Sequence, residues 1–122
     1  DAIIMPMRGG AAANADAVKT SAGALHIIPV CRENSLHNTV SYLQKCGVKV
    51  VAASEKASHL YSQADYSGPL AIVMGAEDVG ISPDILRIVD DMVSIPICGQ
   101  ISSLNVSVAT GVIVYEAVKQ RR

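Results

Sequence analysis

Short apolar runs alternate with amphipathic or polar stretches along most of the chain. An apolar run of four to six residues bounded by Gly, Pro or Ser is typical of a buried strand, whereas apolar residues three and four positions apart are typical of a helix. The runs predict strands at residues 2–5, 27–30, 48–53, 70–74 and 92–97. The spacings predict helices at residues 14–21, 34–47, 82–89 and 105–121, with one further helical turn at 57–60.

Capping residues support these boundaries. Asn34 or Ser35 can cap the second predicted helix, and Gly47 follows its end. Ser82 and Pro83 suit the N-cap and the first position of the third. Because strands and helices alternate, the sequence predicts one α/β domain with a mostly parallel sheet, flanking helices and right-handed crossovers.

The composition agrees with this class and narrows the partners. The chain is half hydrophobic but has only four Tyr and no Phe or Trp, so Val, Ile, Leu and Ala must build the core, as is typical of a parallel sheet covered on both faces. The net charge of −1 gives no chain-wide attraction to nucleic acid, and any RNA contact would need a local patch. No apolar run approaches the ~20 residues of a membrane span.

Cysteine and histidine positions argue against a metal site. Cys31, Cys46 and Cys98 are odd in number and widely spaced, which favours neither disulfides nor metal binding and predicts a reducing, cytoplasmic location. The three His residues lack metal-ligand spacing, and we expect His37 and His59 at the surface.

The predicted helix at 105–121 is apolar around most of its circumference. One side can pack on the sheet, and the other needs a partner. Ser107, Thr110 and Gly111 would permit close approach of a second backbone, so we predict a homodimer through this helix. Coverage by another part of the protein is the alternative. The apolar positions are Val106, Val108, Ala109, Val112, Ile113, Val114, Ala117 and Val118.

A Gly-punctuated acidic loop follows the strand at 70–74. The run Gly75-Ala76-Glu77-Asp78-Val79-Gly80-Ile81-Ser82 nearly has phosphate-loop spacing, but Ile81 stands where the Lys should be. The two acids add negative charge where phosphates would bind, which excludes a nucleoside triphosphate site. Two alternatives remain: a site for a ligand with ribose hydroxyls or a cationic group, and a tight turn with solvated acids.

A second polar loop joins the strand at 92–97 to the last helix. Gly99, Ser102 and Ser103 crowd together there, and Asn105 can cap the helix. Ser103 lacks a Gly-x-Ser-x-Gly elbow and evident His–Asp partners, which argues against a hydrolase. Both loops leave the carboxyl end of a strand, so they would converge on a ligand if the two strands were neighbours.

These two loops carry a family resemblance. Ile72-Val73-Met74-Gly75-Ala76-Glu77-x-x-Gly80-Ile81, then Ile95-Pro96-Ile97 and Ser103-Leu104-Asn105-Val106-Ser107-Val108-Ala109, resemble the motifs of the SpoU/TrmH family of RNA 2′-O-ribose methyltransferases, within the SPOUT superfamily of knotted α/β domains. The resemblance covers the whole chain. It is closest to the bacterial branch that methylates a guanosine ribose in large-subunit ribosomal RNA.

The resemblance implies a deep C-terminal trefoil knot, S-adenosyl-L-methionine bound bent within it, and dimers through the terminal helix. By motif match, Gly75, Ile95 and Leu104 would hold the adenosyl moiety largely through backbone groups. The other implied cofactor contacts are Met74, Ala76, Ile97 and Ser103, and the implied catalytic polar residues are Glu77, Ser103 and Asn105. Residues 8–10 and 19–24 would lie toward the RNA.

One departure limits the expected activity. The family's Asn-x-Gly-x-x-x-Arg motif, whose Arg is thought to help deprotonate the ribose hydroxyl, has no match here, and Arg8 lacks its spacing. We therefore expect a piece of a longer protein that binds cofactor but is inactive or nearly so. The RNA would be ribosomal or transfer RNA, with ribosomal favoured. A non-catalytic RNA-binding or assembly module is the alternative; a generic nucleotide-binding domain is disfavoured by the acidic loop.

Overall fold

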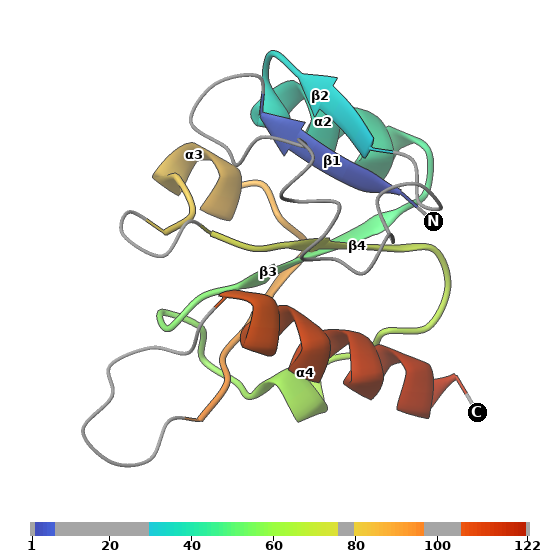
Figure 1. Ribbon diagram of the computed structural model, residues 1–122, viewed down its shortest axis with the longest axis vertical. Coiled ribbons are helices and arrows are strands. Elements are labelled where there is room, and N and C mark those ends of the chain that lie inside the picture. Colours follow the sequence, from blue (N-terminus) through green and yellow to red (C-terminus); the bar gives the residue numbers. More distant parts are fainter. Residues whose placement is uncertain (1, 7–29, 76–79, 97–105, 122) are drawn as a thin grey trace, which may run out of the picture. The chain divides into compact units, whose positions relative to one another are not determined.

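The computed structural model describes residues 2–6, 30–75, 80–96 and 106–121 of the 122-residue chain (Figure 1). The chain divides into two compact units, residues 1–39 and 40–122. The described elements are β1 (Ile3–Pro6), β2 (Val30–Glu33), α2 (Leu36–Lys45), β3 (Lys49–Ala53), the 3₁₀ turn η2 (Tyr61–Gln63), β4 (Leu70–Val73), α3 (Pro83–Leu86), β5 (Asp91–Val93) and α4 (Val106–Gln120).

The first unit contains a parallel pair of strands. β1 pairs with β2, with Ile3 opposite Val30 and Pro6 opposite Glu33. The first predicted strand is confirmed, although Pro6 lies inside β1 rather than stopping it. The second begins where its predicted range ends, because β2 carries exposed polar residues whose backbone pairs without an apolar signature. The predicted helix at 14–21 and residues 27–29 lie outside the described residues.

The second unit is built on a parallel sheet of strand order β4-β3-β5. Val51 of the central strand is opposite Ile72 on one side and Asp91 on the other. Val50, Val51 and Ala52 are fully buried, as expected for a parallel strand covered on both faces. Every described strand pair is parallel, which confirms the predicted α/β class.

Local capping explains the boundaries of α2. The backbone N–H of Asn38 donates to Ser35 Oγ at 3.2 Å, so Ser35 is the N-cap. At the other end Gly47 has φ +86°, its N–H donates to Gln44 O at 3.0 Å, and the N–H of Val48 donates to Leu43 O at 3.0 Å. This is a Schellman ending, and the predicted role of Gly47 is confirmed.

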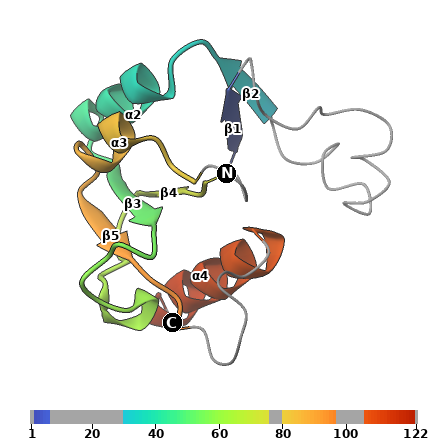
Figure 2. The ribbon, with the colours of Figure 1, turned by 90° about the vertical axis from the view of Figure 1, so that its left-hand side faces the viewer.

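The core of the second unit lies between the sheet and α4. Ile113 and Ala117 of α4 form one buried cluster with Val51 and Val93 of the sheet and with Tyr66 of the segment after η2. Figures 1 and 2 show α4 running along one side of the three-stranded sheet, beside η2. This arrangement places the start of α4 at one end of the core and Gln120 at the other.

Three further predicted elements have wrong bounds. The helical turn lies at 61–63 rather than 57–60, where the N–H of Leu60 donates to Gln63 Oε1 at 2.7 Å. α3 ends at Leu86 and β5 covers only 91–93. Asp90 explains the early start of β5: its N–H donates to Val50 O at 2.9 Å, and its Oδ2 accepts from Val50 N at 2.7 Å. Asp90 thus extends the pairing with β3 before the apolar run begins.

Candidate functional site

The acidic loop begins at Gly75, two residues after the end of β4, and only glycine fits at that position. A Cβ at this position would lie 2.6 Å from Gly80 C and 2.7 Å from Ile81 N, both backbone atoms that cannot move aside. Gly80 has φ +69°, a conformation that favours Gly. The backbone at residues 75 and 80 therefore comes into close contact at the base of the acidic loop, and no larger residue fits at position 75.

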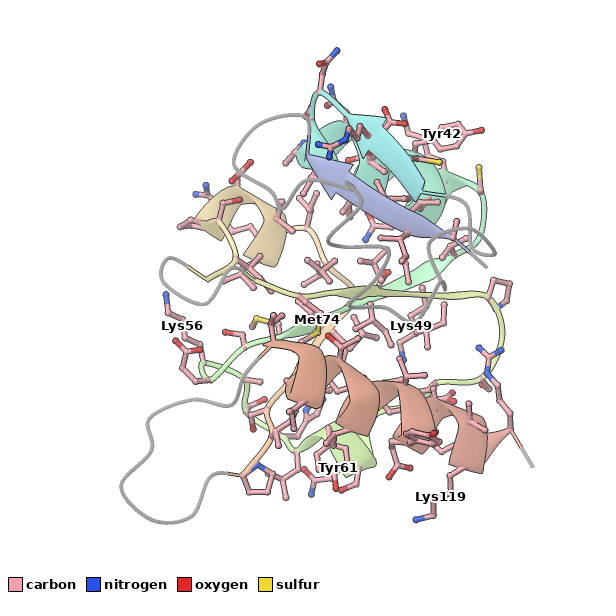
Figure 3. The ribbon with its side chains drawn as sticks, in the orientation of Figure 1. Tyr42, Lys49, Lys56, Tyr61, Met74 and Lys119 are labelled. Atoms are coloured by element: carbon pink, nitrogen blue, oxygen red, sulfur yellow. The ribbon has the colours of Figure 1, made fainter. Side chains whose placement is uncertain are left out.

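The two candidate loops leave strands that are not neighbours. β3 lies between β4 and β5, so the condition on which their convergence was predicted is not met. Two strand spacings separate their ends by about 10 Å. Because the sheet is parallel, both loops still leave the end of the sheet at which the strands have their carboxyl ends. Met74 before one loop and Ile95 before the other also pack against the same buried cluster (Figure 3 labels Met74).

The described residues include only part of the predicted site. Met74, Gly75 and Ile95 are described, and both apolar side chains are partly buried. The remaining predicted cofactor and catalytic residues, and the stretches predicted to face RNA, lie outside the described residues: 8–10, 19–24, Ala76, Glu77, Ile97, Ser103, Leu104 and Asn105.

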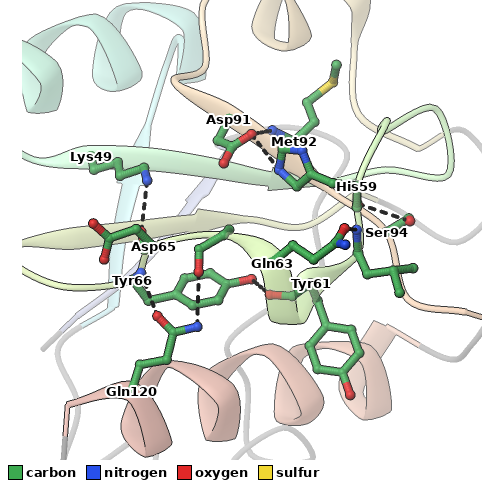
Figure 4. Close-up of polar contacts among 12 residues, drawn as sticks. Lys49, His59, Tyr61, Gln63, Asp65, Tyr66, Asp91, Met92, Ser94 and Gln120 are labelled. Carbon is green, nitrogen blue, oxygen red and sulfur yellow. Dashed lines mark hydrogen bonds and ion pairs between the residues drawn. The ribbon is translucent and has the colours of Figure 1, made fainter.

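His59 and Asp91 form a polar pair at the side of β5, which sequence patterns did not indicate. His59 Nε2 lies 2.9 Å from Asp91 Oδ1, shielded from solvent but not aligned for a hydrogen bond (Figure 4). The carbonyl of His59 accepts from Ser94 N at 3.0 Å, in a short parallel bridge between Leu60 and Ser94. The side chain of His59 as a whole is 34% exposed, in keeping with the expected surface position, although its Nε2 atom is shielded beside Asp91. His59 and Asp91 are far apart in the sequence and meet only through the tertiary pairing, so no spacing of residues could have indicated this pair.

Tyr66 is a buried phenol with a structural role. Its hydroxyl donates to Tyr61 O at 2.5 Å, and its side chain is fully buried. Burial, with the negative charges of Glu116 and Asp91, raises the pKa of Tyr66 to about 12. The phenol stays neutral near pH 7, so it is no acid–base group there. Nearby, hydrogen bonds from the Ser67 hydroxyl and N–H lower the pKa of the exposed Asp65.

The described part of the chain offers no cluster of His, Cys, Asp or Glu that could hold a metal ion. Cys31 and Cys46 are exposed free thiols. Among the helices of that same part, none is long and apolar enough to cross a membrane.

Comparison with curated proteins gives consistent relatives. The chain is 43% identical over 120 residues to the 23S rRNA (guanosine-2′-O-)-methyltransferase RlmB of Vibrio parahaemolyticus. It is 41% identical over 120 residues to RlmB of Escherichia coli K12. Each match covers 98% of this chain and 49% of the relative, so the chain spans about half the length of these proteins.

Solved structures share the fold. The SpoU methyltransferase AviRb from Streptomyces viridochromogenes, in complex with AdoMet, superposes with a TM-score of 0.86 at 28% identity, covering 97% of this chain and 49% of that one. The A. aeolicus TrmH/SpoU tRNA modifying enzyme superposes with a TM-score of 0.79 at 29% identity, covering 98% and 61%. The model of the SpoU rRNA methylase family matches residues 1–115. Since that match takes in nearly the whole sequence, with the two motif loops inside it, the chain belongs to the SpoU rRNA methylase family.

Proposed function

We propose that this chain binds S-adenosyl-L-methionine and forms the catalytic domain of an enzyme that methylates a ribose 2′-hydroxyl of ribosomal RNA. The observation that carries the proposal is the common packing of Met74 and Ile95, which precede the two motif loops at one edge of the sheet. Open parallel sheets bind ligands at the carboxyl ends of their strands. The activities named for the two RlmB relatives support ribosomal RNA as the substrate class.

The described residues at the base of the site fit an adenosyl group. Met74 and Ile95 offer apolar contact, and Gly75 offers backbone groups without a side chain. Leu104, Ala76, Ile97 and Ser103 are the further proposed contacts. When bound, the cofactor supplies a methyl group activated on a sulfonium. The protein's task is to hold that methyl in line with the ribose oxygen and to exclude water.

The ribose hydroxyl is a very weak acid, so its attack needs a positioned proton acceptor. Glu77, Ser103 and Asn105 are the proposed polar groups near the reacting atoms. No Asn-x-Gly-x-x-x-Arg motif is present in the printed sequence. We therefore expect cofactor binding to be retained and methyl transfer by this chain alone to be absent or very slow. We further propose a cytoplasmic location and a C-terminal trefoil knot around the cofactor loop.

The cofactor is tested by calorimetric titration of the folded chain with S-adenosylhomocysteine. We expect the wild type to bind S-adenosylhomocysteine and not to bind ATP. Leu104→Asp should abolish binding, whereas the same substitution at Leu60, whose side chain is 39% exposed on another loop, should preserve it. Gly75 is a poor test position because any side chain there would distort its loop. A folded wild type that takes up no S-adenosylhomocysteine would refute the proposal.

The unmatched Arg motif specifically favours a second function, a non-catalytic RNA-binding module of the same fold. The two functions are separated by incubating the chain with labelled S-adenosylmethionine and a ribosomal RNA fragment. Any label transferred to a ribose 2′-oxygen supports the enzyme. The module is supported if the chain binds RNA without transferring label, and if transfer is still absent after the Arg-containing segment of a relative is supplied.

We also propose that two copies pair through α4. Four large apolar side chains on one side of this helix are exposed, and we call them the outer stripe: Val108 (54%), Val114 (42%), Tyr115 (77%) and Val118 (41%). Gly111 lies within the stripe, and a Cβ added there would meet nothing within 4 Å. An apolar stripe with a glycine at its centre suits close packing against an identical helix.

A further inference from the structure

The last turn of α4 is bonded to an extended segment, residues 64–68, that precedes β4. Gln120 Nε2 donates to Ala64 O at 3.0 Å, and Gln120 Oε1 accepts from Tyr66 N at 3.1 Å (Figure 4). In a parallel sheet, one residue makes this same pair of bonds to positions i and i+2 of its neighbour. The side chain of Gln120 therefore makes the two bonds that a parallel strand would make to this segment.

Arg121 and Glu116 make further hydrogen bonds at this junction. Arg121 donates from Nε and Nη2 to Tyr66 O, at 3.2 and 3.1 Å, and from Nη2 to Gly68 O. Glu116 Oε2 accepts from Gln120 Nε2 at 3.2 Å, which orients the amide so that its nitrogen faces Ala64. We call Gln120 and Arg121, with the carbonyl and N–H groups they bind, the C-terminal clamp.

Apolar packing alone fixes α4 mainly at its middle. The buried face consists of Ala109, Ile113 and Ala117, and Ile113 is its one large side chain. Alanines give little interlocking, so the helix could pivot about Ile113. Ile113 lies seven residues from both Val106 and Gln120, about 10 Å at 1.5 Å per residue. A displacement of one end would therefore move the other end by a similar distance in the opposite direction.

The end opposite the clamp is the one that carries function. Val106, the first residue of α4, directly follows Leu104 and Asn105, which are proposed cofactor and catalytic residues. We infer that Gln120 and Arg121 are positioning residues, which set the cofactor loop from the far end of α4 by preventing the helix from pivoting. This inference rests on the proposed function for its consequence in binding, but the pivot can be measured without the cofactor.

The test uses Gln120→Met, which keeps the length and helix propensity of the side chain but removes its bonds to Ala64 and Tyr66, and with them the bond to Glu116. Lys119→Met is the matched control, since Lys119 is exposed in the same turn and points away from the sheet (Figure 3). Arg121→Met is the second variant, in case Gln120→Met does not fold. All measurements are made well below the unfolding midpoint of each variant.

Hydrogen exchange by mass spectrometry gives the first readout. We expect exchange in the first turn of α4, residues 106–110, to become roughly tenfold faster in Gln120→Met, as loss of a hydrogen-bonded anchor predicts. Exchange in β3 should not change, and Lys119→Met should match the wild type. Faster exchange confined to the last turn would overturn the inference, because the end would then fray without moving the helix.

Affinity for S-adenosylhomocysteine gives the second readout. We expect the dissociation constant to rise about tenfold in Gln120→Met and to stay unchanged in Lys119→Met. A variant that unfolds at lower temperature but binds as the wild type does would show a purely structural role and overturn the inference. If the wild type itself does not bind, the proposed function fails, and the exchange result decides the positioning role alone.

Discussion

The two sides of α4 are both apolar, yet they differ in what covers them. Ala109, Ile113 and Ala117 are buried on the inner side, and the last two pack against the sheet and the segment after η2. The outer stripe exposes three valines and Tyr115, the last at 77%. The covered side therefore carries two alanines around one isoleucine, whereas the exposed side carries valines and a tyrosine.

This difference shows that hydrophobicity does not identify the buried side of such a helix. In α4 the buried side is marked instead by the alanines that flank Ile113, because small side chains allow a close approach to the sheet. The large exposed residues are then the ones that gain most from a partner, since burial of each apolar side chain is worth ~1.5–3 kcal/mol. Four changes test this comparison.

The largest effect is expected at the centre of the inner side. Ile113→Ala should lower the free energy of unfolding by ~2–5 kcal/mol, because it removes the largest fully buried side chain of α4 and leaves a cavity. Val114→Ala, one position along, is the control and should cost less than about 0.5 kcal/mol at dilutions where the chain is monomeric. Urea denaturation measures both. Equal losses at the two positions would mean that the inner and outer sides have been wrongly assigned.

The next effect concerns association. Tyr115→Asp should raise the dissociation constant of the proposed dimer roughly 30-fold or more, since a charged residue at a central aromatic contact costs ~2 kcal/mol or more. Sedimentation equilibrium measures this, with far-UV circular dichroism to show that the fold is kept. Lys56→Asp, in an exposed loop, alters charge without touching the stripe. A wild type that stays monomeric at every accessible concentration would remove the outer stripe as an interface.

A smaller effect is expected beneath the inner side. Tyr66→Phe removes the bond to Tyr61 O and should cost ~0.5–1.5 kcal/mol. The pKa of this phenol rises from 10.0 to about 12 on folding, so the unfolded chain loses its proton first. Stability should be independent of this group below pH 10 and fall as the pH rises from 10 to 12. The denaturation midpoint of the variant should fall less over that range. Parallel declines in both proteins would show that Tyr66 does not contribute.

The smallest change has opposite signs on the two sides of the comparison. Gly111→Ala should stabilise the monomer by ~0.5–1 kcal/mol, because Ala is the better helix former and its Cβ meets no neighbour. The same methyl group should weaken the dimer if a second helix approaches there. Gly68→Ala is the control: it also has open space, but its φ of +76° makes the substitution destabilising. A Gly111→Ala protein that is both more stable and more strongly associated would argue against close packing at Gly111.

Much of the fold could be predicted from residue patterns. Alternating apolar runs identified β3, β4 and α4 within one or two residues, and Ser35 and Gly47 marked the ends of α2. The errors in the two strands have a shared cause. β2 is polar and exposed, and β5 begins early because Asp90 pairs with Val50, so in both cases backbone pairing rather than side-chain character decided the strand. A pattern of side chains does not record such pairing.

The candidate site was predictable as a motif but not as a geometry. Glycine spacing singled out Gly75, yet only the backbone approach of Gly80 and Ile81 explains why glycine is required there. The sequence by itself determined the α/β class and the polar loops, because these follow from composition and local order, and the resemblance of its motifs indicated the family. Tertiary structure alone decided that β3 separates β4 from β5, which side of α4 is covered, and that Gln120 bonds to Tyr66, since each depends on residues far apart in the chain.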